Sequence, residues 1–64
     1  MISFREYQII MAVKDNPGII QRDLIKYLNN NMIGYWSQSS VSGVLSKLVR
    51  VRRIIKIEKY YWYY

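Results

Sequence analysis

The sequence predicts an α+β domain in which three helices fill the first 50 residues and a short β-hairpin follows. Two observations favour this class. Apolar residues recur at helical spacing up to Arg50, and serines stand where two of the helices would begin. From Val51 the pattern changes to alternation, which is typical of a strand. A chain of 64 residues is expected to form one domain, spanning residues 1–64.

The first helix is expected over residues 4–14. Ser3 and Glu6 have the spacing of a capping box, in which each side chain accepts a hydrogen bond from the other residue's backbone amide. Residues 15–18 (DNPG) should end the helix, because proline disfavours helix in the residue before it. The apolar face is expected to hold Phe4, Tyr7, Ile9, Ile10, Met11 and Val13.

The second segment should begin extended at Gly18 and continue as a helix to Leu28. Ile20, Leu24 and Leu28 repeat every four residues, as one helical face requires. The three asparagines at 29–31 are expected to break this helix, because Asn competes for backbone groups and tolerates left-handed conformations. Residues 32–35 would then connect it to the third helix.

The third helix is expected over residues 37–50 (SQSSVSGVLSKLVR), with Ser37 as its N-cap. Trp36 and Val41 have the spacing of a hydrophobic staple, which favours a structural role for Trp36 over a ligand-stacking one. The expected buried stripe is Val41, Val44, Leu45 and Leu48.

The opposite face of this third helix is small: Ser39, Ser42, Gly43, Ser46 and Arg50. A solvated helix would normally carry Glu, Lys or Gln there, because those residues are better helix formers. Gly43 alone costs about 0.5–1 kcal/mol relative to Ala. We therefore expect a partner to come close to this backbone; the alternative is a short helix that tolerates a few serines.

The hairpin is expected to turn at residues 59–60, although neither Lys nor Tyr favours the positive φ of a tight turn, so a longer loop is the alternative. Such a turn would pair Ile57 with Trp62 and Ile55 with Tyr64. The side chains expected on the core-facing side are Ile55, Ile57, Trp62 and Tyr64. Those expected on the outer side are Lys56, Glu58, Tyr61 and Tyr63.

Charge is concentrated at the C-terminal end of the chain. The formal net charge is +6, and residues 47–64 carry six basic side chains against Glu58 alone. A basic cluster at one end indicates a polyanionic partner. The alternative is a solvated strand edge protected by lysine and arginine.

Composition also indicates what the chain does not do. It has no cysteine and no histidine, its four acids form no obvious pair, and no glycine-rich phosphate loop is present. We therefore expect no enzyme activity, no metal, no cofactor and no small-molecule substrate. The longest apolar run, residues 9–13, is far below the ~20 residues of a membrane span, and no signal peptide pattern opens the chain. A cytoplasmic protein with no membrane partner is expected.

The order of helix, Pro-Gly turn, helix, serine-capped helix and basic hairpin resembles the winged helix-turn-helix superfamily, particularly MarR-like and related small regulators. The residues that carry the resemblance are 16–24 (NPGIIQRDL) and 37–48 (SQSSVSGVLSKL), and the likeness covers nearly the whole chain. It implies a short C-terminal β-hairpin wing and a third helix that enters the DNA major groove. Relatives commonly place Arg or Lys early in that helix, where this chain has Gln38 and serines. They also carry a dimerisation helix that is not seen here, so a homodimer stays an open alternative.

The leading hypothesis is a transcriptional regulator that binds double-stranded DNA. The third helix would meet base edges or phosphates through Gln38, Ser39, Ser42 and Ser46. The phosphate backbone would be held by Lys47, Arg50, Arg52, Arg53, Lys56 and Lys59. Isoleucine- and tyrosine-rich usage with consecutive asparagines is typical of an AT-rich genome, and a regulator this short fits a phage, an archaeal virus or a mobile element.

The competing hypothesis is a small inhibitor or adaptor that docks on a host protein through the serine face and exposed tyrosines. The expected partner surface is Tyr60, Tyr61 and Tyr63. The same tyrosines have two further interpretations, as core residues or as a platform on which single-stranded bases stack.

Overall fold

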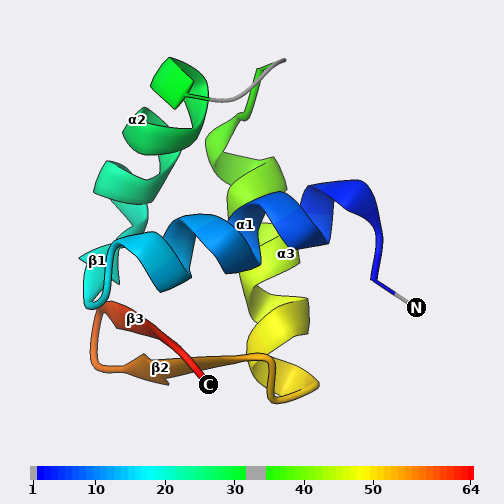
Figure 1. Cartoon of the computed structure of the whole chain (residues 1–64), viewed down its shortest axis with the longest axis vertical. Helices are drawn as coiled ribbons and strands as arrows, with labels where there is room; N and C mark the ends of the chain where they lie inside the picture. Colours follow the sequence, from blue (N-terminus) through cyan, green and yellow to red (C-terminus); the bar gives the residue numbers. More distant parts are fainter. Residues whose placement is uncertain (1, 32–34) are drawn as a thin grey trace.

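The computed structural model describes residues 2–31 and 35–64, which form an α+β domain of three helices and a three-stranded antiparallel sheet (Figure 1). The elements are α1 (Phe4–Asp15), β1 (Ile19–Ile20), α2 (Gln21–Asn31), α3 (Gln38–Arg50), β2 (Ile54–Ile57) and β3 (Tyr60–Tyr63). In the view of Figure 1, α1 crosses in front of α3, and the sheet lies below α1 at the C-terminal end of α3. The predicted class is confirmed, and the extended segment after Gly18 adds a strand to the hairpin.

The capping box at the start of α1 is confirmed. The Ser3 amide donates to Glu6 Oε1 at 2.9 Å, and the Glu6 amide donates to Ser3 Oγ at 3.2 Å. The predicted apolar face is wrong at its first two members, because Phe4 and Tyr7 are exposed. The buried face instead includes Ile9, Ile10, Ala12 and Val13.

The predicted break at the asparagines is wrong, because α2 continues to Asn31. Asn29 has a tertiary role: the Trp36 amide donates to Asn29 Oδ1 at 2.7 Å, and Asn29 Nδ2 donates to the Trp36 carbonyl at 3.0 Å. Asn31 Nδ2 bonds the Tyr27 carbonyl one turn back. These side chains satisfy backbone groups at the end of α2 and at the start of α3. The connection expected over residues 32–35 lies outside the described residues except for Tyr35.

Helix α3 begins and packs as the sequence predicts. Ser37 Oγ accepts from the Ser40 amide at 3.2 Å, which confirms the N-cap. Trp36 is 1 % exposed, and the Arg5 guanidinium lies 3.9 Å from the centre of its ring, so its structural role is confirmed. Of the predicted stripe, Val41, Leu45 and Leu48 are buried, and Val44 is partly buried against them.

A Schellman motif ends α3. The Arg53 amide donates to the Leu48 carbonyl at 2.8 Å, and the Arg52 amide donates to the Val49 carbonyl at 3.1 Å. The residue between the helix and its exit strand must adopt a left-handed conformation, and Arg52 does so with φ 62°. Glycine usually fills this position, because it has no Cβ to meet the following carbonyl oxygen. The turn directs the chain straight into β2.

The sheet has the strand order β1-β3-β2. The hairpin turns at Glu58 and Lys59, one residue before the predicted turn, and Glu58 takes the positive φ at 57°. The pairs are therefore Ile57 with Tyr60, Ile55 with Trp62, Lys56 with Tyr61 and Ile54 with Tyr63. The predicted pairs of Ile57 with Trp62 and of Ile55 with Tyr64 are wrong.

The face of the hairpin that meets the core is also the reverse of the prediction. Ile54 is 1 % exposed and Tyr61 is 6 % exposed, and both pack against the helices. The predicted core residues Ile55, Ile57, Trp62 and Tyr64 are all exposed. Ile54 follows the Schellman turn directly and points into the core, so alternation turns the next residue outward. The buried hydrophobic core of the described residues consists of Ile9, Ile10, Ala12, Val13, Leu24, Leu28, Trp36, Val41, Leu45, Leu48, Ile54 and Tyr61.

Candidate nucleic-acid interface

The small-residue face of α3 is open to solvent. Ser39, Ser42, Gly43 and Ser46 are all exposed, on the side of α3 opposite its buried stripe. Within residues 2–31 and 35–64, a Cβ atom placed on Gly43 would meet nothing within 4 Å, so packing among these residues does not require glycine there. The glycine on this face therefore has no explanation in the contacts of the described residues.

The N-terminal end of α3 shares a hollow with α2. Gln38 lines it together with Gln21, Arg22 and Ile25, and its volume is about 450 Å³. The sequence analysis did not place Arg22 in the interface, because this residue is one of several charges scattered over the first two helices. Its side chain is 85 % exposed, and its nearest acidic contact is long, with Nε 3.7 Å from Asp23 Oδ1. Arg22 lies beside Gln38 because α2 packs against α3, and no local sequence pattern predicts that neighbourhood.

Lys47, at the other end of α3, is tied to α1. Its ammonium donates to Glu6 Oε2 at 2.6 Å, and Glu6 is buried. This hydrogen bond, together with the one from the Ser3 amide, lowers the pKa of the Glu6 carboxyl below its ordinary value of 4.5. Lys47 thus joins two helices, and the role in DNA contact that the sequence predicts for it stays a prediction.

Arg52 and Arg53 follow α3 and face the first helix. Both line a hollow of about 320 Å³ beside Tyr7 of α1 and Tyr63 of β3. Arg53 also lines a second hollow, of about 380 Å³, with Lys47. Both arginines are exposed, as is Arg50 in the last turn of α3. The C-terminal end of α3 therefore presents a dense positive charge to solvent.

The hairpin adds two lysines. Lys59 lies in the turn, with Nζ 5.6 Å from the centre of the Tyr60 ring, and Lys56 lies in β2, with Nζ 5.7 Å from the centre of the Tyr61 ring. Such cation–π contacts hold the aliphatic stem against an aromatic face while the charge stays hydrated. Lys56 and Lys59 are both exposed. Every side chain that the sequence predicts to contact DNA is thus accessible in the folded domain.

The predicted partner surface of tyrosines is divided between the two sides of the sheet. Tyr60 and Tyr63 are exposed, on opposite faces of β3. Placing Tyr61 on that surface is wrong, because its side chain is buried against the helices. Tyr61 pairs with Lys56 on the inner face of the sheet, and removing it would open the core rather than a docking surface.

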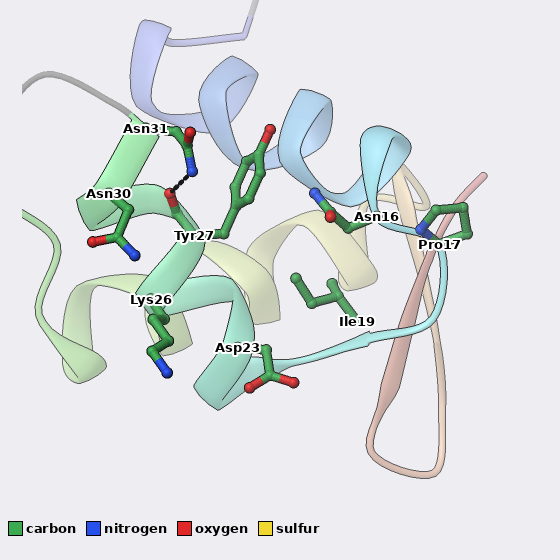
Figure 2. Close-up of a pocket in the computed structure, with 8 residues that line it drawn as sticks. All are labelled: Asn16, Pro17, Ile19, Asp23, Lys26, Tyr27, Asn30 and Asn31. Atoms are coloured by element: carbon green, nitrogen blue, oxygen red, sulfur yellow. Dashed lines mark hydrogen bonds between the residues drawn. The ribbon is translucent and has the colours of Figure 1, made fainter.

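A separate groove of about 440 Å³ lies between the end of α1, β1 and α2 (Figure 2). Figure 2 shows the Tyr27 ring between the side chains of Asn16 and Asn31, with Asp23 and Lys26 nearer the start of α2. Asn16 Nδ2 donates to the Ala12 carbonyl at 2.8 Å, so this amide is already used to end α1. Within residues 2–31 and 35–64, no three His, Cys, Asp or Glu side chains are grouped so that they could hold a metal ion.

No protein-family model, no curated protein and no solved structure matches this chain. Among the helices of the described residues, none combines the length and the apolar character needed to cross a membrane. The interpretation of the interface therefore depends on the geometry and charge of the chain itself.

Proposed function

We propose that this chain is a winged helix-turn-helix protein that binds double-stranded DNA and regulates transcription. In this proposal α3 enters the major groove, and the β2–β3 hairpin is the wing. The observation that carries the proposal is the exposed face of Ser39, Ser42, Gly43 and Ser46, where no described residue would contact a Cβ on Gly43. The major groove, about 12 Å wide, admits an α-helix, and small side chains let the helix backbone sit deep in it.

The charges near this face match a phosphate backbone. Arg22 lies near the first turn of α3, while Arg50, Arg52 and Arg53 lie at and beyond its last turn. Basic groups at both ends of a groove-binding helix hold the phosphates on either side of the groove and carry no sequence information. In this proposal Gln38 reads a base edge, since a glutamine amide can pair with both N6 and N7 of adenine.

The test is a fluorescence-anisotropy titration of labelled random-sequence duplex DNA at several salt concentrations. If Z basic groups contact phosphates, log K falls with log salt at a slope of about −0.9Z. Arg50→Ala should weaken binding and reduce the slope by about 0.9. Lys14→Ala is the matched control: it removes the same charge from the end of α1, where Lys14 Nζ lies 5.2 Å from the Tyr63 ring, and should change binding little.

Two outcomes would count against the proposal. If micromolar protein gives no anisotropy change at low salt, the chain does not bind duplex DNA, and the protein-docking hypothesis replaces this one. If Arg50→Ala and Lys14→Ala weaken binding equally, the attraction comes from net charge alone and α3 has no special part in it.

A further inference from the structure

The outer face of the sheet carries most of the exposed apolar side chains of the hairpin. Ile55 pairs with Trp62, and Ile57 pairs with Tyr60, so these four side chains share one side of the sheet. Ile20 of β1 lies opposite Tyr60 and extends the same side. The four hairpin residues are 36–57 % exposed. We call these five residues the outer sheet face.

This face is held in place by the fold. The Trp62 ring lies so close to the backbone of Gly18 that a Cβ there would be 2.9 Å from the ring, and the Gly18 amide donates to the Tyr61 carbonyl at 2.9 Å. A fixed aromatic anchor loses little conformational freedom on binding, and Trp and Tyr are enriched among the residues that carry binding energy. The outer sheet face is therefore a preformed surface.

The charges around this face favour a second copy of the chain over a polyanion. All five of its side chains are uncharged, although the whole chain carries +6. Lys56 belongs to the inner side of the sheet. The turn at one end of the face carries Lys59, whose Nζ lies 5.6 Å from the centre of the Tyr60 ring, and Glu58 stands beside it. Within the described hairpin, the only charges next to the face are therefore this lysine and glutamate at its turn end, and they offset each other when two copies approach. A nucleic acid would find few cations there.

The exposed area sets the strength of such an association. With aromatic side chains of about 150–250 Å² each, the exposed fractions leave roughly 300–400 Å² of apolar surface on the face. A stable interface buries about 800 Å² on each partner. The apolar part supplies about half of that area, so polar groups around the face must supply the rest, and we expect a weak dimer whose population depends on concentration.

We propose that two copies of this chain pack outer sheet face against outer sheet face, forming a two-fold symmetric homodimer. The same patch on each copy meets its counterpart, as a closed two-fold interface requires. Helices α1 and α3 contact the strands from the inner side, so the dimer leaves the serine face of α3 open. The proposal does not depend on DNA binding.

The experiment is sedimentation equilibrium over a wide range of protein concentration, combined with acrylamide quenching of tryptophan fluorescence. The apparent mass should rise from 7.8 kDa towards twice that value, and quenching should weaken as the mass rises. Trp62 is partly exposed and becomes covered in the dimer, whereas Trp36 is buried in both states. Circular dichroism checks that each variant is folded.

Ile57→Lys is the test variant, because it places a like charge on the face of each copy at a position that is 57 % exposed in the monomer. It should remain monomeric at all concentrations and show constant quenching. Tyr7→Lys is the matched control, at a position on α1 that is 53 % exposed, and it should associate as the unmodified chain does.

Three results would overturn the proposal. The unmodified chain could stay monomeric at every concentration, or Ile57→Lys could associate as strongly as Tyr7→Lys. The mass could also double while tryptophan quenching stays constant, which would place the dimer interface elsewhere. If the monomeric chain becomes protected from quenching only when a single-stranded oligonucleotide is added, the outer sheet face belongs to a nucleic acid instead.

Discussion

Replacing Arg52 with glycine is expected to stabilise the domain and to weaken its binding to DNA. Arg52 occupies the left-handed position of the Schellman motif with φ 62°. This conformation raises the energy of a residue with a Cβ by roughly 1–2 kcal/mol, whereas glycine adopts it without that strain. Glycine has more conformational freedom in the unfolded chain, and this entropy reduces the stabilisation by about 0.5–1 kcal/mol. The free energy of unfolding should therefore rise by about 0.5–1 kcal/mol.

This gain is measurable in a domain of this size. At 4–8 °C per kcal/mol for small domains, the melting temperature should rise by roughly 2–8 °C in a thermal scan followed by circular dichroism. The same substitution removes a cation from the end of α3. The salt slope of DNA binding should fall by about 0.9, with an affinity loss that grows as salt is lowered.

Arg53→Gly is the matched control, because it removes the same charge at the adjacent residue, which is not among those with positive φ. It should weaken DNA binding in a similar way, but it should lower the melting temperature, because glycine there adds only unfolded-state entropy. If Arg52→Gly melts at or below the temperature of the unmodified chain, the strain assigned to Arg52 is absent. If its DNA affinity is unchanged, Arg52 does not contact phosphate.

Four further substitutions test the packing of the domain and the Glu6 carboxyl. Gly18→Ala should destabilise by about 1–3 kcal/mol in urea unfolding, because φ is +78° and the added Cβ meets an indole ring at 2.9 Å; a neutral result would contradict that contact. Leu48→Ala should lower the free energy of unfolding by about 2–5 kcal/mol in the same assay. Ser46→Leu should leave stability unchanged and should reduce DNA affinity in anisotropy titrations. The reverse pattern would mean that the buried side of α3 is misplaced. Glu6→Gln should flatten the pH dependence of the free energy of unfolding. Because the pKa of the Glu6 carboxyl is lowered in the folded state, the ionised group stabilises the fold above pH 4.5, and this contribution is lost as pH falls through the folded-state pKa. The urea midpoints of the variant and the unmodified chain should therefore converge in acid.

Local signals predicted the parts of the fold that depend on neighbouring residues. The caps at Ser3 and Ser37 and the buried stripe of α3 are confirmed, because each is set by spacing within a single helix. The asparagines at the end of α2 were misjudged for a non-local reason. Asn29 bonds both backbone groups of Trp36, seven residues away, and this tertiary contact outweighs the poor helix propensity of Asn.

Alternation in the hairpin predicted which side chains share a face but not which face meets the core. Both faces carry large apolar residues, with Ile54 and Tyr61 on one side and Ile55 and Trp62 on the other. The choice depends on how the Schellman motif aims the chain out of α3, which the sequence pattern does not encode. Of the candidate interface, the serine face could be predicted from one helix, whereas the place of Arg22 beside α3 required the packed structure.

Amide chemical shifts recorded by NMR during a titration with duplex DNA test the central claim most directly. We predict that the largest changes fall on Ser39, Ser42, Gly43 and Ser46, because these amides lie on the face of α3 that enters the groove. Changes confined to α1 or to the outer sheet face, with the α3 amides unmoved, would contradict that claim even if the protein binds DNA.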